Sequence, residues 1–313
     1  TALGYQAASG AWANEDVAGI VAIGSQSLSG ALEGTTDFTI AIGRECLQSL
    51  TSGAGNVAIG YQAADGITTG DRNIAIGYTA MGASGGATVL DSQDNVFIGY
   101  NSGGGTWVTA KNNENVAVGN QTMAGAMNSA VNNTAIGYSS GYAITTGDSN
   151  TFIGSTSGGL MTTGSSNIAI GRSALYAHTT GSRNIAIGHG AMDGTAEDDA
   201  PTSTDNIFIG HDAGGGSWDD GADSTDDSNF NVGIGNYCMD AAMDGALNNT
   251  AVGYGAATDL TTGDSNSVFG SQVAENIVGG SENTMIGNFA GGTTTDVDKT
   301  VIIGANSAIA DMT

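Results

Sequence analysis

The sequence lacks the features that define several common protein classes. It has 1 proline and no glycine period of three, which excludes a collagen-like helix although 52 of its 313 residues are glycine. It has no apolar run approaching the roughly 20 residues of a membrane-spanning helix, and no basic and then apolar leader at its start. Only 12% of residues are charged, but 40% are hydrophobic, with Val and Ile recurring in register. The chain is therefore expected to be ordered.

Positive charge is also scarce. Six Lys and Arg residues stand against 31 Asp and Glu residues, which gives a formal net charge of −25. Such a chain repels nucleic acid and anionic membranes, so neither is expected as a partner and membrane insertion is not expected. The sequence starts within a repeat at Thr1, without Met, which indicates a section of a longer chain.

What the sequence does contain is a repeat. A glycine, here called an anchor glycine, follows a short apolar run seventeen times, at spacings of 17 to 25 residues with 17 the commonest. A fixed short period is typical of solenoids, whose units bury their apolar faces on their neighbours. We predict an all-β parallel β-roll or β-solenoid of about 17 short coils, each with two short strands and two turns. The anchors are Gly4, Gly24, Gly43, Gly60, Gly77, Gly99, Gly119, Gly137, Gly154, Gly171, Gly188, Gly210, Gly235, Gly253, Gly270, Gly287 and Gly304.

A longer period overlies the short one. Trp12, Trp107 and Trp218 each fall eight residues after an anchor, which divides residues 1–313 into three super-units starting near residues 4, 99 and 210. Enlarged coils cluster at the junctions and carry two acidic segments, 194–206 and 217–229. We interpret the whole as one repetitive shaft.

The residues before each anchor alternate as in a strand. We expect the first and third residues before the anchor, mostly Ile and Val, to point into the core, so that Ile170→Asp would break the coil. The second residue before the anchor, for example Ala58 or Phe97, should then point outward, and it is never charged. This pattern predicts an outer face covered by other copies of the chain; the alternative is that alanine is merely tolerated at an exposed site.

Two further columns have structural interpretations. Asn occupies the fourth position before most anchors, as in Asn73 and Asn184, where stacked amides can hydrogen-bond to the next coil. A uniformly small residue stands three positions after the anchor, and Cys46 and Cys238 share that position in coils far apart in the sequence. We expect both cysteines to be small buried fillers without a disulfide bond.

The polar residues do not converge on a pocket, so we predict a non-enzymatic protein without catalytic residues or cofactors. The position after the anchor forms a stripe of Tyr, Arg, His and Asn, which is either a solvated polar ladder or a surface for a glycan or protein receptor. The three tryptophans either anchor a partner or cover the enlarged coils. The candidate surface-binding residues are Trp12, Trp107, Trp218, Tyr61, Tyr78, Tyr100, Tyr138, Arg172, His189, His211 and Tyr254.

Ion and ice binding are minor alternatives. His189 and His211 with Asp212 suggest a metal pair, but the polar ladder is favoured and no metal site is predicted. The calcium nonapeptide is absent, and Asp71, Asp148 and Asp264 mark only some turns, so divalent ions are expected at most at the acidic segments. Thr-Thr pairs, such as Thr162–Thr163 and Thr179–Thr180, suggest an ice-binding array over only three consecutive coils.

Three motifs resemble known fibre repeats. NVAIGYQA (56–63), NTAIGYSS (133–140) and NIAIGRSAL (167–175), with Thr-Thr-Gly turns between coils, resemble the heads of YadA-type trimeric autotransporter adhesins and repeats of bacteriophage tail-fibre and surface-fibre proteins. The resemblance implies a left-handed β-roll, a homotrimer and an extracellular location on a virion fibre or bacterial surface. It also implies attachment to a host cell or surface. The alternative is a self-assembling filament or spacer that binds no receptor.

Overall fold

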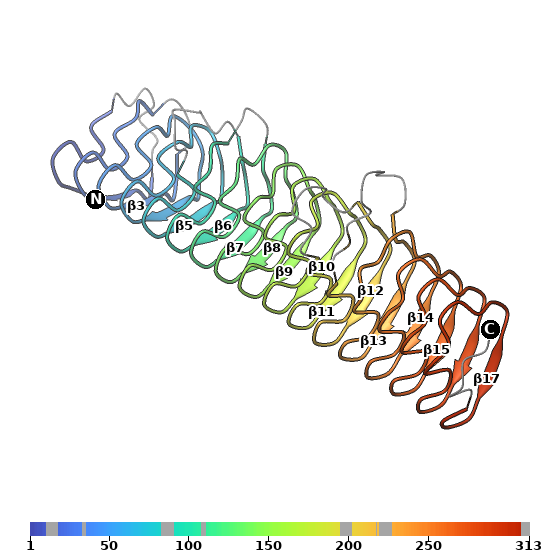
Figure 1. Cartoon of the computed structure of the whole chain (residues 1–313). Coiled ribbons are helices and arrows are strands. Elements are labelled where there is room, and N and C mark those ends of the chain that lie inside the picture. Colours follow the sequence, from blue (N-terminus) through green and yellow to red (C-terminus); the bar gives the residue numbers. More distant parts are fainter. Residues whose placement is uncertain are drawn as a thin grey trace. The chain divides into compact units, whose positions relative to one another are not determined.

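A computed structural model describes residues 1–10, 18–32, 36–82, 91–107, 111–194, 202–216, 218 and 227–307. The described residues form an all-β solenoid without helices (Figure 1). The chain divides into two compact units, Thr1–Asn150 and Thr151–Thr313. The division falls inside the second super-unit, and the single shaft and the super-units remain predictions from the sequence.

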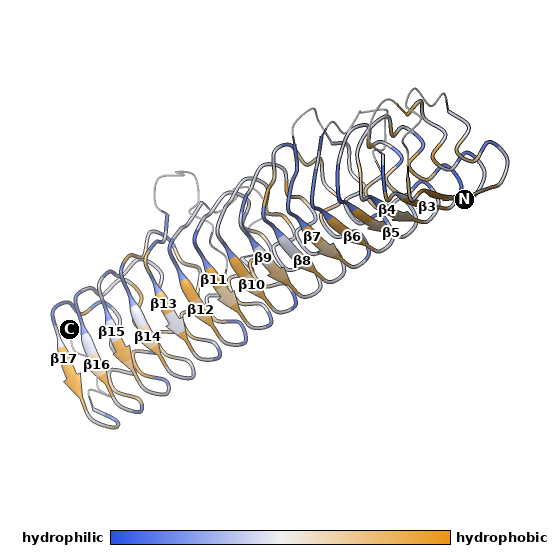
Figure 2. Ribbon diagram, turned by 180° about the vertical axis from the view of Figure 1, so that it is seen from behind, coloured by the Kyte–Doolittle hydropathy of each residue, from blue (hydrophilic) through white to orange (hydrophobic). Residues whose placement is uncertain are grey.

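Each strand is short and ends immediately before an anchor glycine, as the repeat predicts. The strands are rich in Val and Ile, β-branched residues that fit a pleated surface, and most are coloured as hydrophobic in Figure 2. Unit 1 contains β1 (Ala2–Leu3), β2 (Val21–Ile23), β3 (Ile40–Ile42), β4 (Val57–Ile59), β5 (Ile74–Ile76), β6 (Val96–Ile98), β7 (Val116–Val118) and β8 (Thr134–Ile136). Unit 2 contains β9 (Thr151–Ile153), β10 (Ile168–Ile170), β11 (Ile185–Ile187), β12 (Ile207–Ile209), β13 (Val232–Ile234), β14 (Thr250–Val252), β15 (Ser267–Phe269), β16 (Thr284–Ile286) and β17 (Val301–Ile303).

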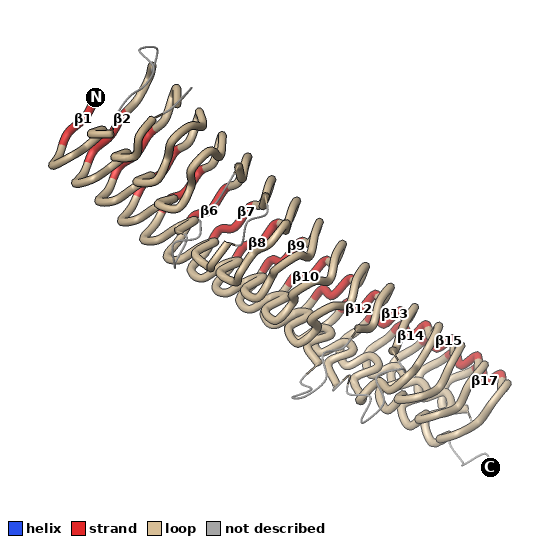
Figure 3. Tube along the Cα trace, turned by 90° about the horizontal axis from the view of Figure 1, so that it is seen from above, coloured by secondary structure: helices blue, strands red, loops and turns tan. Residues whose placement is uncertain are grey.

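Within each unit, successive strands pair in parallel and in register. Ile168, Ala169 and Ile170 of β10 lie opposite Ile185, Ala186 and Ile187 of β11. Figure 3 shows the strands of successive coils stacked one behind another. The described part of each coil holds one three-residue strand, or two residues in β1, instead of the two strands expected, because turns and bends occupy most of the remainder.

The anchor position requires glycine for a physical reason. Gly171 has φ +134°, and a Cβ there would lie 2.2 Å from the carbonyl oxygen of Gly188 in the next coil. Any other residue would combine a strained backbone with a backbone clash. The close stacking of successive coils therefore depends on the repeated glycine.

The inward and outward faces of the strands are the reverse of the sequence prediction. Ala58, Ala169 and Phe97, the middle residues of their strands, are buried at 1%, 0% and 0% exposure. The flanking residues point outward, and Ile59 and Ile168 are each 36% exposed. The middle column is uncharged because it forms the core, so Ala169 and not Ile170 is the position where an aspartate would be buried.

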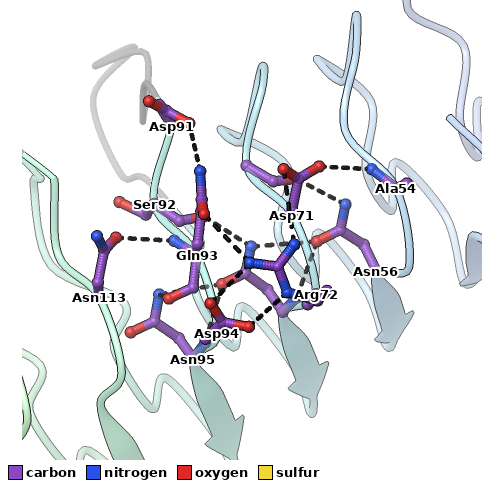
Figure 4. Close-up of polar contacts among 12 residues, drawn as sticks. Ala54, Asn56, Asp71, Arg72, Asp91, Ser92, Gln93, Asp94, Asn95 and Asn113 are labelled. Carbon is purple, nitrogen blue, oxygen red and sulfur yellow. Dashed lines mark hydrogen bonds and ion pairs between the residues drawn. The ribbon is translucent and has the colours of Figure 1, made fainter. Parts of the chain in front are cut away.

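The asparagines four residues before the anchors form a buried, hydrogen-bonded ladder, which confirms the prediction for this position. The Oδ1 atom of Asn133 accepts hydrogen bonds from the backbone N and the Nδ2 of Asn150, both at 3.0 Å. Asn56, labelled in Figure 4, is arranged in the same way, because its Oδ1 accepts hydrogen bonds from the backbone N and the Nδ2 of Asn73, the next asparagine of the ladder. Because each amide is paired with the next coil, burying the whole column leaves these groups satisfied.

The small column is buried, as predicted. Ala63, Ser157 and Ala174 are fully buried, and so are Cys46 and Cys238, which carry free thiols. Each thiol lies against a strand carbonyl, with Sγ 3.1 Å from the oxygen of Ala58 and 3.3 Å from that of Ala251, respectively. Burial raises the pKa of both thiols to about 12, so they are unreactive fillers.

Candidate interaction surface

The outward side chains of the strands form what we call the apolar face. It consists of the first and last residues of the strands, and the last residue is apolar in every strand of both units. Ile136 in unit 1 is 40% exposed, and Ile153, Ile234 and Ile286 in unit 2 are 37–40% exposed. The first residue is Val, Ile, Thr or Ser in every three-residue strand. No charged residue interrupts this face within the strands, which is unusual for a sheet surface open to water.

The residues directly after the anchors form a second exposed stripe, here called the post-anchor ladder. In unit 1 the rings of Tyr61, Tyr78 and Tyr100 stack in series, with centroids 5.0 and 5.6 Å apart. The guanidinium of Arg44 lies 5.7 Å from the Tyr61 ring centroid and pairs with Glu45 at 2.7 Å. This pairing lowers the pKa of the Glu45 carboxyl. The result is a row of aromatic rings with polar edges.

The other predicted members of the ladder are also at the surface. Tyr138 and Tyr254 are 56% and 55% exposed, and Arg172 and His189 are exposed. His211 is half-buried and packs edge-on against Tyr237, with ring centroids 5.3 Å apart. Unit 2 thus presents a mixed aromatic and basic stripe on an otherwise acidic chain.

His189, His211 and Asp212 come together in unit 2. The two imidazole rings stack with centroids 5.0 Å apart and planes 10° apart. Asp212 lies between them, with its oxygens 3.7 Å from Nδ1 of His189 and 2.9 Å from Nδ1 of His211. Burial, and then repulsion by Asp212, raises the pKa of both Asp193 and Asp240 to about 6. The cluster therefore concentrates three carboxylates around two imidazoles.

Trp107 and Trp218 lie in the interior. They are 1% and 4% exposed, and each indole Nε1 donates a hydrogen bond to the backbone carbonyl four residues earlier, of Gly103 or Gly214. Each ring packs edge-on against the phenylalanine of the preceding strand, Phe97 at 5.5 Å or Phe208 at 5.6 Å. This placement favours the interpretation that these tryptophans cover the enlarged coils, and it argues against their anchoring a partner. Trp12 lies outside the described residues.

The buried histidine beside Trp218 was not predicted from the sequence. His178 is fully buried, its ring centroid lies 5.2 Å from that of Trp218, and neither ring nitrogen has a hydrogen-bond partner among the described residues. Desolvation lowers the pKa of His178 to about 4. The two residues are far apart in the sequence, so only the coiling of the chain could reveal the contact.

The turn aspartates have a structural role. Asp71, Asp148 and Asp264 each accept a hydrogen bond from a backbone N–H of the preceding coil, at 2.7–2.8 Å. Thr162 and Thr163 lie in a bend, where the Thr162 hydroxyl donates to the carbonyl of Thr179. These residues tie coils together. Much of the two acidic segments lies outside the described residues.

Two bidentate ion pairs occupy equivalent places in the two units. Arg72 holds Asp94 through Nε at 2.6 Å and Nη2 at 2.8 Å (Figure 4). Arg183 holds Asp205 in the same way, at 2.6 and 2.7 Å. The arginines lower the pKa of both carboxyls. Because the pairs are exposed, they fix the turns more than they add stability.

No protein-family model, curated protein or solved structure matches the chain. The part of the chain that the structure describes contains no candidate membrane-spanning helix. The resemblance to adhesin and phage-fibre repeats thus depends on the short motifs alone.

Proposed function

We propose that the chain is a non-enzymatic segment of a homotrimeric extracellular fibre that attaches to a host cell or surface. The observation that carries the proposal is the apolar face, which combines half-exposed Ile and Val columns with the absence of charge. A continuous row of exposed apolar side chains favours association with another surface. A second copy of the same chain can cover the apolar face, because it brings an equally apolar face to the contact. Three copies is the number that the resemblance to trimeric fibre repeats implies.

The post-anchor ladder supports the attachment role. Flat rings with polar edges, as in Tyr61, Tyr78 and Tyr100, suit the faces of sugars and the surfaces of proteins. A spacer would not need such a stripe, so the ladder favours adhesion over the second candidate, a structural filament without a receptor.

The test of association compares adjacent residues of one strand. Light scattering of the wild-type chain should give a mass near three times 30.9 kDa. Ile170→Asp should preserve the β circular dichroism signal but lower that mass, because its side chain lies on the apolar face. Ala169→Asp should instead unfold the coil, because the carboxylate would be buried without a partner. A wild-type monomer would contradict the proposal.

The test of attachment uses the assembled wild-type protein and cells or glycan arrays. Changing Tyr78 and Tyr100 together to Ala should abolish binding without changing the mass, since both rings are 52% exposed. The matched control is Leu160→Ala, which removes an exposed apolar side chain outside the ladder. Assembly without any binding would favour the spacer.

A further inference from the structure

The cluster of His189, His211 and Asp212 has the composition of a metal site. Each residue offers one ligand atom, and these atoms all lie within 4.8 Å of one another. His189 and His211 follow the anchors of β11 and β12, so the parallel register of these strands brings the imidazoles together. No other group of three such residues meets this distance among the described residues.

The backbone fixes the carboxylate between the two rings. Asp212 adopts φ +48°, and its N–H donates a 2.9 Å hydrogen bond to the carbonyl of His189. Nδ1 of His211 is sheltered from solvent and makes no aligned hydrogen bond within the described structure, although Asp212 Oδ2 lies 2.9 Å away. Imidazole nitrogens and carboxylate oxygens are both zinc ligands, so this nitrogen and the Asp212 oxygen can bind one cation together.

Further negative charge surrounds the cluster. The Cβ position of Gly190 lies 2.2 Å from Oδ1 of Asp212 and 3.4 Å from Oδ2 of Asp193, so these two carboxylates face the same small space. Glycine is needed there because any side chain would fill that space. A bound cation would offset the repulsion between the carboxylates.

We infer that His189, His211 and Asp212 bind one divalent transition-metal ion of the zinc class. Two imidazoles and a carboxylate are a common ligand set for such ions, whereas calcium and magnesium prefer oxygen ligands alone. The imidazoles are 49% and 43% exposed, so they can turn to converge on one ion. The ion would link the coil ends after β11 and β12 and stabilise unit 2. Water or Asp193 would complete its coordination.

The test is calorimetric titration of the chain, without a histidine tag and freed of metal by chelation, with ZnCl2 in excess MgCl2. Magnesium occupies non-specific acidic sites, so one zinc site per chain should remain. The double variant H189Q/H211Q should lose that site, whereas Tyr254→Phe, a change at the same ladder position, should keep it. No zinc binding by the wild type, or equal binding by the double variant, would overturn the inference.

Cobalt provides a second measurement that needs no variant. Co2+ bound through two imidazoles should give visible absorption bands distinct from those of cobalt bound by oxygen ligands alone. Zinc should displace the cobalt, so that these bands disappear, and it should raise the thermal unfolding midpoint of the chain. An all-oxygen spectrum would assign the binding to the acidic segments and contradict the proposed ligands.

Discussion

At the scale of single residues, His178 makes the clearest link between burial and pH. Its imidazole is fully buried and has no hydrogen-bond partner in the described structure, so the folded state favours the neutral form. The pKa falls from an ordinary 6.5 to about 4. The unfolded chain therefore binds more protons between these pH values, and stability should decrease as the pH falls from 6.5 to 4.

The difference in pKa corresponds to about 3 kcal/mol of unfolding free energy. His178→Leu should remove this part of the pH dependence, which urea unfolding at pH 4, 5, 6 and 7 would measure. Leu160→Ala is the control because the Leu160 side chain is exposed and uncharged. Identical profiles for wild type and His178→Leu would show that His178 is not buried in its neutral form.

At the scale of the coil, the sizes of two interior residues are coupled: the middle residue of the strand and the residue four positions after the anchor. Phe152 faces Gly158, whose Cβ position lies 2.6 Å from the Phe152 ring, whereas in the next coil Ala169 accompanies Leu175. Phe97 with Gly103 and Phe208 with Gly214 repeat the first arrangement. A large residue in the strand thus requires a small one four residues after the anchor, whereas a small strand residue tolerates either size, as Ala169 with Leu175 and Ala135 with Gly141 show.

This coupling of sizes predicts the outcome of a double-mutant cycle. Phe152→Ala should cost about 3–5 kcal/mol through the cavity it leaves, and Gly158→Leu should cost about 1–3 kcal/mol through overpacking. The double variant reproduces the Ala169 and Leu175 arrangement and should recover at least 1 kcal/mol of the summed loss, about what contacting residues give. Denaturant unfolding of the four proteins measures the coupling, and strictly additive losses would contradict it.

The asparagine ladder makes a separate prediction about coil stacking. Asn249 accepts hydrogen bonds from N and Nδ2 of Asn266 and donates to the carbonyl of Gly263 at 2.7 Å. Asn249→Ala leaves these buried groups unpaired and should cost about 3 kcal/mol. Asn288 is exposed, so Asn288→Ala should cost less than about 0.5 kcal/mol in the same unfolding assay. Similar losses would show that the ladder does not stabilise the stack.

At the scale of the whole molecule, the charge of −25 opposes the proposed association. Like-charged copies repel one another over about 30 Å in 0.01 M salt but only about 8 Å in 0.15 M salt. Added NaCl should therefore lower the concentration needed for assembly, as sedimentation at the two salt concentrations would detect. If copies associated mainly through ion pairs, salt would instead dissociate them.

Much of this architecture follows from the repeat. The anchor glycines mark the end of every strand, and the asparagine and small-residue columns predict the buried ladder and the cysteine environments. The inward face was predicted wrongly because both faces of these strands are apolar. Alternation shows which residues share a face, but it does not show which of the two faces is buried. The pairing of Phe152 with Gly158 was a sequence signal that could have identified the correct face.

The sequence by itself determined the period, the strand positions and the parallel stacking, because each coil must place the same residue beside its copy. The tertiary structure decided which strand face closes over the core. The backbone after the anchor is left-handed at residues such as Ser173 and Leu175, and the coil buries Leu175 together with the middle strand residue, Ala169. The repeat places His189 and His211 directly after consecutive anchors, so their stacking follows from the sequence. Only the tertiary structure decided the contact of His178 with Trp218, because it joins different coils and its distance depends on how the intervening segment closes.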